Sequence, residues 1–140
     1  MYLEGTTTAV CIRQRWVDFF EHRKDGYYLE IQHSGGSAQG FIAGLTLPEE
    51  YRKRIIMVTI AGEVAIPDGL FKRVYNYRST HDVVPHFQKV LGNFSTKSAE
   101  VTVLKRHPDA RFFDHSYASP TYEERLIDHM SNFIEGAYDN

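Results

Sequence analysis

The sequence has one cysteine, no surplus of positive charge and no long apolar run, and each absence excludes a class of protein. Cys11 alone cannot form an intrachain disulfide or a zinc site built on paired cysteines, and it favours a reducing compartment, the cytoplasm. Sixteen Lys and Arg against eighteen Asp and Glu give a formal net charge of −2. Nucleic acid is therefore not an expected partner, because nothing offsets its phosphates. No stretch approaches the ~20 consecutive apolar residues of a membrane span, and no signal peptide is evident.

The composition is that of a folded, soluble domain. Apolar residues make up 42% of the chain and charged residues 24%, which excludes a disordered or collagen-like chain. The length of 140 residues is room for one ordinary domain. No internal repeat or linker divides the chain. We therefore interpret residues 1–140 as a single domain, either an intracellular protein or a piece of a larger one.

Hydrophobic periodicity predicts alternating helices and strands. An apolar stripe predicts a first helix from Thr8, its N-cap, to Lys24, and Ser119 is the expected N-cap of the last helix. The continuous apolar run Ile55–Ile60 is typical of a strand covered on both faces. The expected order is helix 8–24, strand 27–32, helix 37–47, strands 55–60, 73–77 and 100–104, and helix 120–135. This order predicts an α/β fold, a mostly parallel sheet of about four strands flanked by helices.

Ser34 lies at a junction where a strand runs straight into a helix, in Gln32-His33-Ser34-Gly35-Gly36. Such a junction is typical of a nucleophile elbow, a strained turn that raises the serine hydroxyl above the sheet edge. The elbow needs small residues two before and two after the serine, because strand and helix approach closely there. Gly36 fits the second position, whereas Gln32 departs from the first. An ordinary Ser-Gly-Gly turn is the alternative interpretation.

Two further residues have the order and setting of a catalytic triad. Asp82 follows the third apolar strand and His115 follows the fourth, so the chain order is Ser34, Asp82, His115. All three should emerge at one edge of a parallel sheet. Alone, Asp82 would be interpreted as a turn aspartate and His115 as a surface histidine. His81, beside Asp82 in the sequence, is the second candidate for the catalytic base.

From Tyr27 to about Met130 the sequence resembles the C-terminal half of an α/β-hydrolase, closest to the lipase-like branch. It also resembles a family of uncharacterised chlamydial proteins with a hydrolase-like domain. The segments that carry the resemblance are Gln32–Gly36, Ile56–Gly62, Val74–Tyr77, Asp82-Val83-Val84-Pro85 and the loop around His115. The resemblance implies a reduced, half-hydrolase sandwich. It also implies that Ser34 is the nucleophile, His115 the general base and then acid, Asp82 the orienting carboxylate, and the Gly35 N–H an oxyanion donor.

The sequence lacks the strands and the loop that precede the elbow in hydrolases of this fold. That loop supplies the second oxyanion donor, and Gly5-Thr6-Thr7-Thr8 is the remaining candidate here. Without those strands, Tyr27–Gln32 becomes an exposed edge that invites pairing with a second copy of the chain or another partner. Two hypotheses follow. One is a serine hydrolase acting on an ester or thioester of a small or lipid-like acid, and the other is a catalytically degenerate binding or assembly module.

Other side chains are candidates for the substrate site. His33 precedes the serine, and Phe112, Phe113 and Tyr117 surround His115, so these four are expected to line a substrate pocket. Glu63 follows the second strand, and it lies either near that pocket or in solvent. The histidines His33, His81 and His86 match no tight metal-binding spacing, so we expect no metal and no cofactor.

Overall fold

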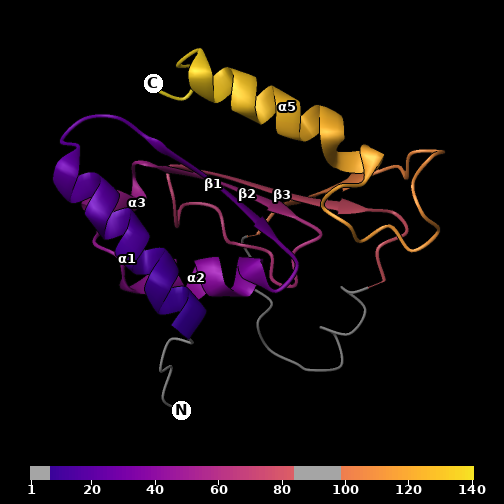
Figure 1. Cartoon of the computed structure of the whole chain (residues 1–140), viewed down its shortest axis with the longest axis horizontal. Helices are drawn as coiled ribbons and strands as arrows, with labels where there is room; N and C mark the ends of the chain where they lie inside the picture. The colour runs from indigo at the N-terminus through magenta and orange to yellow at the C-terminus, as the bar shows by residue number, and fades with distance from the viewer. Residues whose placement is uncertain (1–6, 84–98) are drawn as a thin grey trace.

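The computed structural model describes residues 7–83 and 99–140, and in them the chain forms a parallel four-stranded sheet between two layers of helices. The strands are β1 (Tyr28–His33), β2 (Ile55–Ile60), β3 (Arg73–Ser79) and β4 (Val101–Leu104), in the spatial order β1-β2-β3-β4. Figure 1 shows α1 (Thr7–His22) and α2 (Gly36–Thr46) on one face of the sheet and α5 (Pro120–Ile134) on the other. The predicted α/β fold is confirmed.

The structure differs from the predicted elements mainly at their ends. The first helix already begins at Thr7, so the prediction of Thr8 as its N-cap is wrong and Thr8 lies inside the first turn. A short helix that was not predicted, α3 (Glu49–Arg52), follows Pro48. Four residues are too few to show a helical period in the sequence. Ser119 caps α5 as predicted, because its side chain accepts a hydrogen bond from the backbone N–H of Thr121.

The central strand β2 separates two apolar cores. All six of its residues are buried, and their side chains alternate between the two faces of the sheet. On the α1 and α2 side, Met57 packs in a cluster with Trp16 and Phe71. On the α5 side, Val58 packs in a second cluster with Tyr122. A continuous apolar strand therefore serves both layers, as its sequence predicted.

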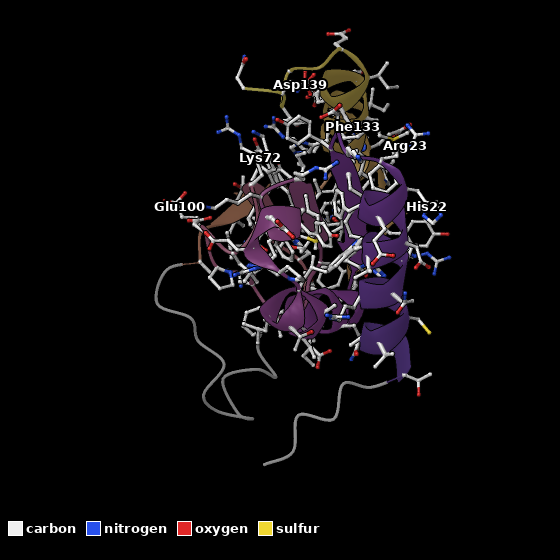
Figure 2. The ribbon with its side chains drawn as sticks, turned by 90° about the vertical axis from the view of Figure 1, so that its left-hand side faces the viewer. His22, Arg23, Lys72, Glu100, Phe133 and Asp139 are labelled. Carbon is white, nitrogen blue, oxygen red and sulfur yellow. The ribbon has the colours of Figure 1, made fainter. Side chains whose placement is uncertain are left out.

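The strand β1 lies at one edge of the sheet, and within residues 7–83 and 99–140 it pairs with β2 alone. The backbone N–H groups of Tyr28 and Ser34 donate to β2-side carbonyls. Because successive backbone groups alternate in direction, the N–H and C=O of Ile31 point outward, away from the sheet. Beside this edge runs a groove of about 460 Å³, lined mostly by apolar side chains. Figure 2 shows Arg23, which directly follows α1, and Phe133 of α5, both part of its lining, at the same end of the molecule.

The edge strand carries an inward-pointing carboxylate. Glu30 is 5% exposed and faces α1, where the Trp16 indole N–H donates to its Oε2 at 2.9 Å. Arg15 donates to both carboxylate oxygens, at 2.8 and 3.0 Å, and the Gln32 amide also donates to Oε1. A buried carboxylate is tolerated only when it is paired and hydrogen-bonded. These contacts tie α1 to the edge of the sheet.

None of the helices in the described part of the chain combines the length and the apolar character needed to cross a membrane.

We expect Trp16→Phe to destabilise the fold by about 1–3 kcal/mol, because it keeps an aromatic ring but leaves one oxygen of a buried carboxylate without its donor. Urea unfolding followed by circular dichroism measures this free energy, because Trp16 is the only tryptophan of the chain and its fluorescence is lost in the variant. The matched control is Val10→Ala, at a position 56% exposed on the same helix, which should change the stability by less than about 0.5 kcal/mol. A Trp16→Phe protein as stable as the control would show that the Trp16–Glu30 hydrogen bond does not contribute.

Candidate active site

Ser34 lies in a left-handed turn between β1 and α2. Its φ angle is 51°, a conformation that is uncommon for a residue with a side chain and that concentrates at functional sites. The Ser34 carbonyl accepts three hydrogen bonds, from the N–H and the hydroxyl of Ser37 and from the N–H of Glu63, at 3.1, 2.8 and 3.0 Å. These bonds offset the strain of the turn. The conformation is that of the strained elbow predicted from the sequence.

Gln32, the residue that departs from the elbow pattern, is accommodated by the glycines of α2. A Cβ atom on Gly36 would lie 2.5 Å from Gln32 Oε1, and one on Gly40 would lie 3.4 Å from Gln32 Cγ. The glutamine side chain therefore lies over the start of the helix, in space that a helix side chain would otherwise fill. The close approach of strand and helix is preserved with the small residue on the helix side only.

The structure brings together the three residues that the sequence singled out. His115 Nε2 lies 2.8 Å from Ser34 Oγ, and His115 Nδ1 lies 2.9 Å from Asp82 Oδ1. The Asp82 side chain is fully buried, whereas that of His115 is 27% exposed. With Nδ1–H donating to the carboxylate, Nε2 is left as the acceptor for the serine hydroxyl. This geometry suits transfer of a proton from Ser34 to His115.

His81, the second candidate for the base, lies elsewhere. Its Nδ1 is 3.1 Å from Thr80 Oγ1, and its ring packs edge-on against Phe112 at 5.5 Å. Its backbone carbonyl accepts from the N–H of Asp114, which links the two loops that carry Asp82 and His115. His86 and the Val84-Pro85 dipeptide lie outside the described residues.

Asp114, which sequence reasoning missed, anchors the loop that carries His115. It is 1% exposed, and the Thr121 hydroxyl donates to its Oδ2 at 2.5 Å. Burial raises the pKa of the Asp114 carboxyl, but the nearby hydroxyl groups of Ser119, Thr121 and Ser79 and the positive charge of Arg106 outweigh burial and hold that pKa below its ordinary value. The available signal was the group of hydroxyl residues at the start of α5, which the sequence analysis used only as a helix cap.

Tyr122 joins this anchor to the sheet. Its hydroxyl accepts from the backbone N–H of Ser79 at 2.8 Å and donates to the carbonyl of Asp114 at 3.4 Å. Burial raises the pKa of Tyr122 far above its ordinary value, so this hydroxyl stays protonated. The start of α5, the end of β3 and the loop that carries His115 therefore form one connected unit.

His33 contacts the backbone of the base. Its Nε2 lies 2.6 Å from the carbonyl oxygen of His115, and its ring is 5.1 Å from the His115 ring and 5.6 Å from that of Tyr117. A carbonyl only accepts, so His33 donates from Nε2. Sequence reasoning placed His33 in the substrate pocket. The structure places its polar atom on the loop that carries His115.

The three aromatic residues expected to line a pocket lie on the surface around His115. Phe112, Phe113 and Tyr117 are 68%, 66% and 66% exposed. Phe112 and Phe113 contact each other edge to face, with ring centres 5.2 Å apart. The Phe112 ring contacts that of His81, and the Tyr117 ring contacts that of His33, so these exposed aromatic side chains could contact an apolar group near His115.

Gly35, directly after the serine, is the N-cap of α2. Its backbone N–H makes no hydrogen bond to any described residue, so it is available to an anion, and the N-terminal end of a helix favours negative charge there. Of the residues considered for a second donor, Thr7 and Thr8 lie in the first turn of α1, and Gly5 and Thr6 lie outside the described residues.

Comparison with known proteins adds no assignment. No protein-family model matches the chain, and no curated protein matches its sequence significantly. Within the described ranges, no group of three or more His, Cys, Asp or Glu side chains is arranged to hold a metal ion. The interpretation of the site therefore depends on its geometry.

We expect Asp114→Asn to destabilise the protein near pH 7 by about 1–3 kcal/mol, because buried hydroxyl groups lose a charged acceptor. The carboxyl pKa is lower in the folded protein than its ordinary value of 3.8, so its stabilisation is complete above that value and is lost as the pH falls through the folded pKa. Urea unfolding at several pH values should show the difference between wild type and variant shrinking in acid. Asp109→Asn, at a side chain 87% exposed, is the control. A difference that does not depend on pH would contradict this role.

Proposed function

We propose that the protein is a serine hydrolase that acts on an ester or thioester of a small or lipid-like acid. The observation that carries the proposal is the hydrogen-bonded series Ser34–His115–Asp82 at 2.8 and 2.9 Å. The left-handed turn at Ser34 and the free N–H of Gly35 support it. The resemblance of the sequence to lipase-like α/β-hydrolases agrees with this assignment.

In the proposed reaction Ser34 Oγ attacks the substrate carbonyl while His115 Nε2 takes the hydroxyl proton. Asp82 holds the imidazole through Nδ1 and stabilises the imidazolium that forms. The Gly35 N–H donates to the oxyanion of the tetrahedral intermediate. The bond to the leaving alcohol or thiol then breaks, and His115 returns the proton to that leaving group. In the second half of the reaction His115 deprotonates a water molecule that attacks the acyl carbonyl. The bond to Ser34 Oγ then breaks, His115 returns the proton to that oxygen, and the acid leaves.

The exposed rings of Phe112, Phe113 and Tyr117 are the proposed contact for the apolar part of the substrate. They flank His115 and are not covered by other described residues. An aromatic surface in this position binds an acyl or alkyl group by removing apolar area from water. The fold by itself does not decide which acid is bound.

A fluorophosphonate probe, which reacts with activated serines, tests the proposal directly. We expect one covalent adduct on Ser34, located by mass spectrometry of the digested protein, and none in Ser34→Ala. Asp82→Asn should lower the rate of labelling by about 10³–10⁴, because the imidazole loses the correct tautomer. Absence of labelling in a protein shown to be folded would contradict the assignment.

The competing hypothesis is a degenerate binding or assembly module. The observation that favours it is the open edge of β1. The backbone groups of Ile31 point outward there, and a groove of about 460 Å³ runs beside the strand. No described segment pairs with this edge or fills the groove. Pairing of this edge with a second copy of the chain would explain the exposed strand. A folded protein that associates with itself but does not react with the probe would favour this second function.

His33 gives a further test, because its contact separates positioning from substrate binding. We expect His33→Leu to lower kcat roughly 10–100-fold with little change in KM, since the loop of His115 loses a hydrogen bond that aligns the base. His33→Gln retains a donor at a similar distance along the side chain and should restore most of kcat. Steady-state kinetics on a neutral p-nitrophenyl ester measure both. If both variants instead raise KM alone, His33 contacts the substrate.

A further inference from the structure

Glu63 is held against the nucleophile turn. The strand β2 ends at Ile60, and Ala61 then adopts a left-handed φ of 49°, the second such residue besides glycine in the described chain. The turn places Glu63 N–H on the Ser34 carbonyl at 3.0 Å and Val64 N–H on the Ser37 hydroxyl at 2.9 Å. Two backbone hydrogen bonds therefore fix the segment that carries Glu63 to the elbow.

The Glu63 carboxylate lies over the proposed oxyanion donor. A Cβ atom on Gly35 would lie 3.2 Å from Glu63 Oε2, so the carboxylate stands directly beside this residue. Glu63 is exposed, and its side chain makes no hydrogen bond or ion pair with any residue in 7–83 or 99–140. It does not cap α2, because the N-terminus of that helix receives no side-chain hydrogen bond. The structure thus holds, next to Ser34, a negative charge that no described residue pairs.

This charge has a chemical consequence for the proposed hydrolysis. A carboxylate beside the Gly35 N–H repels the oxyanion that forms there, which slows the reaction of a neutral ester. A positive charge on the substrate, one carbon away from the reacting carbonyl, reverses the effect, because it lies between the carboxylate and the oxyanion. The α-ammonium group of an amino acid ester is such a charge.

We propose that Glu63 is a specificity-determining residue that selects esters or thioesters of α-amino acids with a free α-ammonium group. The inference rests on the proposed hydrolase function and names the substrate class of the same site. Glu63 binds the ammonium, Ser34 attacks the adjacent carbonyl, and water releases the free amino acid together with the alcohol or thiol. The reaction is otherwise the one already described.

The test compares two substrates of nearly equal shape, the p-nitrophenyl esters of alanine and of isobutyric acid, which differ by an ammonium in place of a methyl group. The quantity measured is the ratio of their kcat/KM values, corrected for spontaneous hydrolysis, near pH 6, where the α-amino group is charged. We expect this ratio to fall roughly fivefold in Glu63→Gln, the effect of one exposed ion pair. Comparing ratios between proteins cancels the difference in intrinsic reactivity of the two esters.

Asp68→Asn is the matched control. It also removes one exposed carboxylate, but from the turn that leads into β3, and Asp68 makes no hydrogen bond or ion pair with Ser34, His115 or Asp82. The ratio should be unchanged in this variant. A ratio that falls equally in both variants would show an effect of net charge, and the role of Glu63 would be overturned.

The remaining outcomes separate this inference from the proposed function. If Glu63→Gln speeds both esters equally, Glu63 obstructs the oxyanion position without selecting charge, and the inference is wrong. If Ser34 reacts with the fluorophosphonate and the isobutyrate ester is hydrolysed with no effect of Glu63 on the ratio, the hydrolase assignment stands and the inference falls. If Ser34 does not react and neither ester is hydrolysed, both fail.

Discussion

The parallel pairing of β1 with β2 is the constraint on which the candidate site depends. The register that sets His33 opposite Ile60 ends β1 just before Ser34 and β2 just before Ala61, so both strands leave the sheet together. The residue after each strand, Ser34 or Ala61, has a left-handed φ angle. The Glu63 N–H donates to the Ser34 carbonyl, and this hydrogen bond joins the two turns. Ser34 is therefore positioned from two strands at once. His115 reaches it from a third direction, on a loop that Asp114 and Tyr122 fasten to the end of β3.

Sequence reasoning predicted the fold and singled out three residues that the structure brings together, because both leave local signals. The continuous apolar run of Ile55–Ile60 and the strand-to-helix junction at Ser34 are visible in the chain itself, and chain order suffices to place Asp82 and His115 at the same edge of a parallel sheet. What it missed depends on contacts between distant segments. Asp114 and Thr121 acquire their roles only when the loop before α5 folds onto it, and no spacing in the sequence records which way a side chain such as His33 points.

The same limit explains how Gln32 was interpreted. The pattern asks for a small residue two positions before the serine, which is the strand side of the contact between β1 and α2. Small residues on the helix side provide the same space. In this structure the space is supplied by Gly36 and Gly40 of α2, with the glutamine side chain laid across them. Gly36 and Gly40 thus offset the departure of Gln32 from the sequence pattern. Gln32 therefore argues less strongly against a nucleophilic Ser34 than the pattern alone suggests.

The buried carboxylate of Glu30 favours one alignment of the edge strand β1 against β2. Side chains alternate along a strand, so sliding β1 by one residue against β2 would turn Glu30 toward α5, away from Arg15 and Trp16. An unpaired carboxylate would then lie against an apolar layer, and Ser34 would no longer meet the end of its neighbouring strand. Glu30 thereby acts as a check on alignment, because a slip by one residue would separate its charge from Arg15 and Trp16 and also move Ser34 away from its histidine.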